Sequence, residues 1–133
     1  MNISTFIALY LLSLPIFFII DLLWLGVIAK SFYRDRIGHL MEISWAPAIV
    51  FYLIFLLGLT YFATYPALAG GWKTALLLGA LFGFFTYATY ELTNLATLKD
   101  WPLSLVLVDI AWGTVLGGLV AVVTFFIYTN FLS

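Results

Sequence analysis

Long apolar segments alternate with short polar segments along this chain. Four apolar segments are each long enough to cross a bilayer, which takes about 20 mostly apolar residues: Ser4–Ala29, Trp45–Tyr65, Thr74–Leu98 and Leu103–Phe131. Lipid offers no hydrogen bonds, so the backbone must pair within each segment, which favours helices over strands. The pattern therefore predicts four transmembrane helices in a single domain over residues 1–133.

The segments between the predicted helices are short. Lys30–Glu42 carries most of the charge, Pro66–Lys73 contains two consecutive glycines, and Lys99–Pro102 is a tight turn. Helices joined by short connections pack as antiparallel neighbours. We therefore expect an all-α integral membrane protein, an antiparallel bundle of four transmembrane helices.

Positive charge is unequal at the two ends of this bundle. The second connection carries only Lys73, and the remaining Lys and Arg residues lie in the first and third connections: Lys30, Arg34, Arg36 and Lys99. Connections rich in Lys and Arg tend to remain in the cytoplasm, so both termini are predicted to lie outside. Lys30–Met41 is expected to form a short amphipathic helix at the membrane surface. Its Arg34, Arg36 and His39 would then face lipid headgroups.

The composition excludes a water-soluble domain. Only 8% of the residues are charged and 65% are hydrophobic, whereas soluble domains carry about 25% charged residues. Membrane lipids are therefore the expected surroundings. A net charge of -1 argues against nucleic acid as a partner. No cofactor is evident: with no Cys, a single His and no Lys inside a span, haem, iron–sulfur clusters, Cys-ligated zinc and retinal are not expected.

Three of the six acidic residues lie inside predicted spans: Asp21, Glu91 and Asp109. An ionised carboxylate at the centre of a membrane helix costs about 2.5–3.5 kcal/mol even on lenient scales. At a rise of about 1.5 Å per residue, each acid lies about 10–12 Å from the end of its span that adjoins the Lys- and Arg-rich connections. All three acids are therefore expected at one depth in the membrane. This shared depth is the strongest functional signal in the sequence.

The helical faces agree with a shared site. Residues at i and i+4 lie on one face of a helix, and small residues at this spacing let helices approach closely. The acids are therefore predicted on packing faces, in two stripes: Gly79, Gly83, Tyr87 and Glu91 in the third span, and Asp109, Gly113 and Gly117 in the fourth. Hydrogen-bonding and aromatic residues are expected to support them: Trp24, Tyr87, Tyr90, Thr93, Asn94 and Trp112.

An Asp-x-x-Trp motif occurs in the first span, at Asp21–Trp24, and again in the last, at Asp109–Trp112. The expected role of each tryptophan is packing, with its indole N–H donated to a nearby carboxylate. Three neighbouring carboxylates in a low dielectric cannot all be ionised without a counter-charge. Four interpretations stay open: the acids share protons, hold a metal ion or another cation, pair with an Arg that reaches in from the surface, or join helices as protonated hydrogen-bonding groups.

Several segments carry a resemblance to a known family. They are Asp21–Gly26, Phe32–Tyr33, Gly38–His39, Trp45–Pro47, Phe51–Tyr52, Tyr87–Leu98, Trp101–Pro102 and Val108–Gly113. At these residues the chain resembles, over nearly its whole length, the small bacterial membrane proteins known as domain of unknown function number twenty-one seventy-seven. The chain departs from this family at Glu91, where the family carries Asp. The resemblance implies a multi-pass protein of the bacterial cytoplasmic (inner) membrane and implies no activity.

Three functions fit this pattern. Cation binding, or translocation coupled to a cation or a proton, is favoured because buried acids on packed helices are typical of ion pathways. A chain this short would dimerise to enclose such a pathway. A membrane enzyme acting on a lipid or another apolar substrate could use the acids as general acid and base or as metal ligands. A subunit that binds a lipid or a partner is the third.

Overall fold

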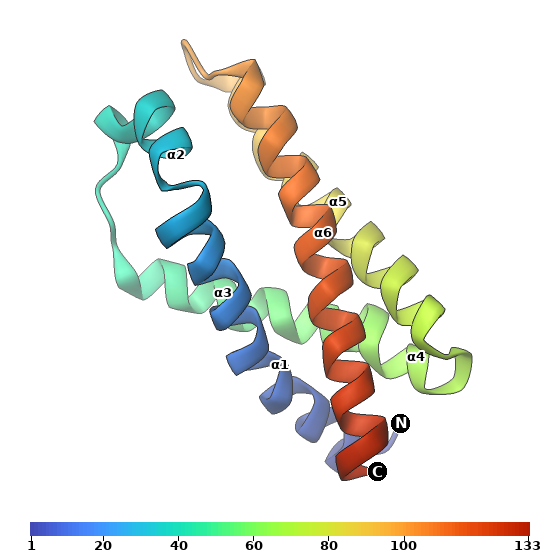
Figure 1. The fold of residues 1–133 in the computed structure, drawn as a ribbon. Coiled ribbons are helices and arrows are strands. Elements are labelled where there is room, and N and C mark those ends of the chain that lie inside the picture. Colours follow the sequence, from blue (N-terminus) through green and yellow to red (C-terminus); the bar gives the residue numbers. More distant parts are fainter.

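The computed structural model describes residues 1–133, and every element in it is helical (Figure 1). Four of its helical segments are long and apolar enough to cross a membrane: Ile3–Ile28, Trp45–Gly70, Trp72–Thr97 and Leu103–Leu132. The four predicted spans are therefore confirmed. The elements in chain order are α1 (Ile3–Leu23), η1 (Trp24–Ile28), α2 (Lys30–Ile37), η2 (Gly38–Leu40), α3 (Trp45–Leu59), η3 (Thr60–Thr64), α4 (Tyr65–Gly70), α5 (Trp72–Thr97), α6 (Leu103–Ile127) and η4 (Tyr128–Leu132).

The second span is longer than its sequence pattern indicated. It was predicted to end at Tyr65, but the helix continues through η3 and α4 to Gly70. Pro66 lies in the first turn of α4, which directly follows the π-helical turn η3, where the regular α-helical hydrogen-bond ladder is already interrupted. The predicted connection from Pro66 to Lys73 is therefore wrong. The chain reverses at Gly71, whose φ of 96° favours glycine.

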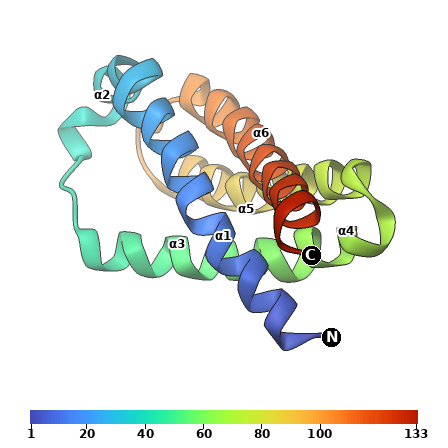
Figure 2. The same ribbon diagram turned by 60° about the horizontal axis from the view of Figure 1, so that its bottom comes forward.

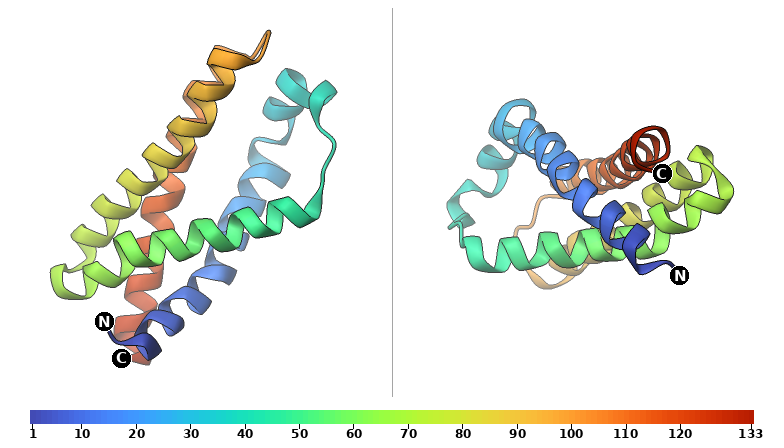
Figure 3. Two further views of the ribbon diagram at one scale, coloured as in Figure 1. Left: turned by 180° about the vertical axis from the view of Figure 1, so that it is seen from behind. Right: turned by 90° about the horizontal axis from the view of Figure 1, so that it is seen from below.

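The helices do not all run alongside one another. α5 and α6 form a closely packed antiparallel pair, whereas α3 crosses the other spans obliquely (Figures 1 and 2). Both termini lie at one end of the molecule, and α2 and the turn between α5 and α6 lie at the other (Figure 3). We call this second end the loop end. The antiparallel order agrees with the prediction, while the oblique course of α3 departs from a regular bundle.

Glycines bring α5 and α6 into close contact. A Cβ added to Gly83 would lie 1.9 Å from the Gly113 carbonyl oxygen, and one added to Gly117 would lie 2.2 Å from the Gly79 carbonyl oxygen. All four glycines are buried. The two predicted small-residue stripes are therefore the faces along which these helices meet, and the same faces carry Glu91 and Asp109 towards one another.

Gly83→Ala is expected to destabilise the fold by about 1–3 kcal/mol, because the added methyl group overlaps the backbone of α6. Gly26→Ala is the matched control, since nothing lies within 4 Å of the Cβ it would add. Alanine is the better helix former, so the control should be neutral or slightly stabilising. Unfolding of the purified proteins in detergent measures both effects, and equal stability of the two variants would contradict the close contact.

Candidate functional site

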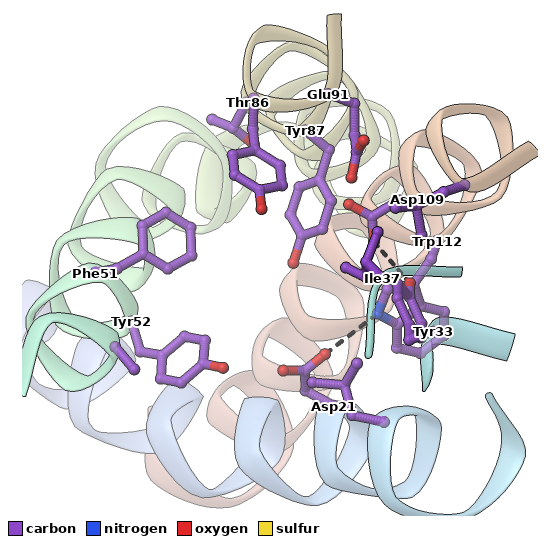
Figure 4. Close-up of a pocket in the computed structure, with 14 residues that line it drawn as sticks. Asp21, Tyr33, Ile37, Phe51, Tyr52, Thr86, Tyr87, Glu91, Asp109 and Trp112 are labelled. Carbon is purple, nitrogen blue, oxygen red and sulfur yellow. Dashed lines mark hydrogen bonds between the residues drawn. The ribbon is translucent and has the colours of Figure 1, made fainter. Parts of the chain in front are cut away.

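A cavity of about 400 Å³ lies among the helices, and all three intramembrane acids line it (Figure 4). Its volume falls within the range of small-molecule sites, which is about 300–1,000 Å³. Ten of its 14 lining residues are hydrophobic, so the acids are the main polar feature of an otherwise apolar and aromatic wall. The aromatic lining residues are Tyr33, Phe51, Tyr52, Tyr87, Tyr90 and Trp112.

The three acids are buried, with 5% of Asp21, 1% of Glu91 and 8% of Asp109 exposed. Each accepts a hydrogen bond from an aromatic side chain, which satisfies one carboxyl oxygen without supplying a positive charge. The bonds run from Trp112 Nε1–H to Asp21 Oδ1 (3.2 Å), from Tyr33 O–H to Asp109 Oδ1 (2.7 Å) and from Trp101 Nε1–H to Glu91 Oε2 (2.8 Å).

The two Asp-x-x-Trp motifs are connected across the structure. Trp112 on α6 donates to Asp21 on α1. In the opposite direction, Trp24 on η1 donates to the Tyr33 hydroxyl at 3.0 Å, and Tyr33 donates to Asp109 on α6. The two indole rings stack, with centroids 4.4 Å apart and planes 8° from parallel. The expected indole-to-carboxylate contact is thus direct for Trp112 and passes through Tyr33 for Trp24.

Glu91 and Asp109 form a carboxyl pair. Their side chains face each other across the contact between α5 and α6 and are within hydrogen-bonding reach (Figure 4). An ionised carboxylate has no proton to donate, so two carboxyl groups form a hydrogen bond only when one of them is protonated. The geometry therefore favours a proton shared between Glu91 and Asp109.

Asp21 lies apart from this pair, on the other side of the cavity (Figure 4). No group of three His, Cys, Asp or Glu side chains is close enough to hold a metal ion. The predicted metal site at Asp21, Glu91 and Asp109 is therefore wrong. Asp21 projects from α1 and is bound by Trp112 of α6, while close packing of α5 and α6 brings the other two acids together.

Basic side chains are engaged elsewhere. The Arg36 Nε–H donates to the Ser104 hydroxyl at 2.8 Å, and the Arg36 guanidinium lies 3.7 Å from the centroid of the Phe32 ring. Arg34 and His39 are exposed on α2 and η2. The Arg36–Ser104 bond ties α2 to the start of α6. The acid–Arg pairing considered from the sequence is therefore not formed, and the headgroup contacts predicted for these residues remain a prediction.

Tyr33 connects this surface helix to the interior. Partial burial raises the pKa of the Tyr33 hydroxyl above its ordinary value, and the nearby Asp109 carboxylate raises it further. The phenol therefore stays neutral at physiological pH. It keeps the proton that it donates to Asp109.

The structure divides the predicted supporting residues into two groups. Trp24, Tyr87, Tyr90 and Trp112 line the cavity or join its hydrogen bonds. Asn94 lines a second pocket of about 570 Å³ at the loop end, which we call the outer pocket. Thr93 was wrongly included, because its hydroxyl donates to carbonyl groups of α5 itself and its side chain is exposed.

Sequence reasoning missed Tyr33, Tyr52 and Trp101 as site residues. Trp101 lies in the short turn between α5 and α6, and its indole folds back across this turn to Glu91. Tyr33 lies in a polar connection, and no pattern in the sequence shows that this connection returns to α6. Tyr52 faces the cavity only because α3 crosses the other spans obliquely.

The fold and the buried acids define a multi-pass membrane protein with an acidic, aromatic cavity between its helices. The family model described as "Predicted membrane protein (DUF2177)" matches residues 6–126, and the chain belongs to this family, as its sequence motifs indicated. No curated protein and no solved structure matches the chain. The description of the family names no activity, so the function must be argued from the cavity.

Tyr33→Phe is expected to destabilise the protein by about 1–3 kcal/mol, because Asp109 loses a donor and Trp24 loses an acceptor. Tyr61→Phe removes a hydroxyl from an exposed side chain and serves as the matched control. Unfolding in detergent compares the two variants, and near-ultraviolet circular dichroism reports the stacked indoles. A Tyr33→Phe variant as stable as the control would rule out an energetic role for the network.

Proposed function

We propose that the protein binds a small organic cation in the cavity, exchanges it for a proton and carries such cations across the membrane. One observation carries the proposal: three buried carboxyl groups without a basic partner line a cavity with aromatic walls. Buried charges are normally paired, because an isolated charge in an apolar medium is very costly. A bound cation supplies the charge that the chain itself does not.

The walls of the cavity favour an organic cation over an inorganic one. Ca²⁺ takes six to eight oxygen ligands at short range, whereas most of the lining here is apolar. Alkylammonium groups instead bind well beside aromatic faces and carboxylates. Tyr52, Tyr87 and Trp112 supply such faces next to Asp21 (Figure 4).

The carboxyl pair supplies the proton for exchange. An ammonium group beside Glu91 and Asp109 stabilises both carboxylates in their ionised forms and so favours release of the shared proton. Access from the loop end is supported by the outer pocket, which shares Ile37 and Tyr90 with the cavity. These two side chains would form the boundary that a ligand passes.

We further propose that the loop end is cytoplasmic and that both termini lie outside, in the bacterial inner membrane. Four basic residues lie at the loop end, namely Lys30, Arg34, Arg36 and Lys99, and positive charge favours the cytoplasmic side. Both termini lie at the opposite end (Figure 1). A homodimer is proposed as the transporting unit, because four helices are few for surrounding a transport pathway completely.

The carboxyl pair also favours a second candidate, a membrane enzyme that acts on a lipid or another apolar substrate. One carboxyl group of Glu91 and Asp109 would donate a proton while the other accepts one, as in general acid–base catalysis. We rank this function below cation binding because Asp21 and its aromatic surroundings would have no part in it.

Hexylammonium is expected to stabilise the purified protein in detergent, whereas hexanol, its neutral counterpart of equal chain length, is not. At one hundred times its Kd, a ligand specific for the folded state adds about 2.7 kcal/mol. Thermal unfolding measured against ligand concentration tests this expectation. Equal shifts with both compounds would show partitioning of the alkyl chain alone and would contradict a cation site.

Hexylammonium affinity is expected to rise from pH 6 to pH 9, because a lower proton concentration favours loss of the shared proton, while the amine, with a pKa of about 10.4, stays mostly charged. Calorimetry in two buffers of different ionisation enthalpy measures the protons released. Glu91→Gln should abolish the release, and Asp35→Asn, on the exposed face of α2, should leave it intact. Proton release that persists in Glu91→Gln would exclude the carboxyl pair as its source.

A further inference from the structure

We propose that the preferred ligand is a linear diamine, with its two ammonium groups at opposite ends of the cavity. This inference rests on the proposed cation-binding function and specifies its ligand class. It follows from how the acids are distributed, from how many charges they carry and from what lies between them.

The acids occupy two separate places. Glu91 and Asp109 face each other at one end of the cavity, and Asp21 lies at the other end, near Tyr52 (Figure 4). The three are not close enough together to surround one ion. A single positive centre at one end would therefore leave the other end without a counter-charge.

The charge balance calls for two positive groups. With its shared proton released on binding, the Glu91–Asp109 pair carries two negative charges, and an ionised Asp21 carries a third. No basic side chain offsets these charges, since Arg36 is bound to Ser104 and the other four are exposed: Lys30, Arg34, Lys73 and Lys99. A dication offsets one charge at each end of the cavity, whereas a monocation leaves one end without any counter-charge, which is costly in an apolar surrounding.

Hydrogen-bonding capacity is free at the Asp21 end. Asp21 is 5% exposed, its Oδ1 accepts from Trp112, and its second carboxyl oxygen has no partner in the chain. The Tyr52 and Tyr87 hydroxyl groups point into the same space (Figure 4). An ammonium group has three N–H donors. It can therefore satisfy the free carboxyl oxygen and donate to a phenol oxygen as well.

The space between the two ends suits an alkyl chain. The Tyr87 ring and Trp112 line this part of the cavity (Figure 4). Transfer of methylene groups from water to such a wall is favourable, whereas a polar linker would lose its hydration. A ligand charged at both ends and apolar in the middle matches this sequence of surfaces.

The test is a calorimetric binding series on the purified wild-type protein in detergent. The ligands are the linear diamines from diaminoethane to diaminooctane, each compared with the n-alkylamine of equal carbon number. We expect one diamine length to bind at least about tenfold tighter than its monoamine, since a close charge pair contributes at least that much. Shorter and longer diamines should bind several-fold more weakly than the optimum.

Asp21→Asn should remove the advantage of the best diamine over its monoamine. Asp35→Asn makes the same chemical change on the exposed face of α2 and should keep that advantage. A tenfold preference that survives Asp21→Asn would overturn the inference. If Asp21→Asn does not fold, the length series on the wild-type protein decides alone.

The series separates failure of the inference from failure of the proposed function. Monoamines that bind as tightly as every diamine would overturn the diamine inference and leave organic-cation binding in place. If neither series binds better than hexanol, both proposals fall. An optimum chain length with a clear preference for diamines supports both.

Discussion

The structure depends on the burial of three carboxyl groups among membrane helices without a basic neighbour. Each of them accepts an indole or phenol hydrogen bond, and two of them are close enough to share a proton. Hydrogen bonds of this kind reduce the desolvation cost but do not remove it. The remaining deficit of positive charge is the basis of the proposed cation site.

Close packing of α5 against α6 creates the carboxyl pair. Glycines at Gly79, Gly83, Gly113 and Gly117 allow the two backbones to approach, and the acids on the same faces then meet. The Tyr87 ring packs against Gly113 and is thereby directed towards the cavity. α3 crosses obliquely, and its Phe51 and Tyr52 form the opposite wall. One tight contact and one oblique crossing thus produce both the carboxyl pair and the space beside it.

The crossed Asp-x-x-Trp motifs join the surface to the interior. Because Trp24 acts through Tyr33, the short helix α2 becomes part of the hydrogen-bonding network of Asp109. The Arg36 contact with Ser104 holds the same helix against α6. A surface element that lipids and solvent can reach is therefore coupled, through one phenol, to a carboxyl group that lines the cavity.

The number of spans and the packing faces of α5 and α6 could be predicted from the sequence alone. These features follow from bilayer thickness, a constant helical rise and side-chain size, all of which act locally along one helix. The packing of the helices against one another pairs two of the acids, leaves the third apart, and makes Tyr33 and Trp101 donors. The spans are apolar nearly all round because lipid surrounds them, so their hydrophobic pattern carries little information about helix rotation and tilt. Rotation and tilt are what place side chains from different helices in contact.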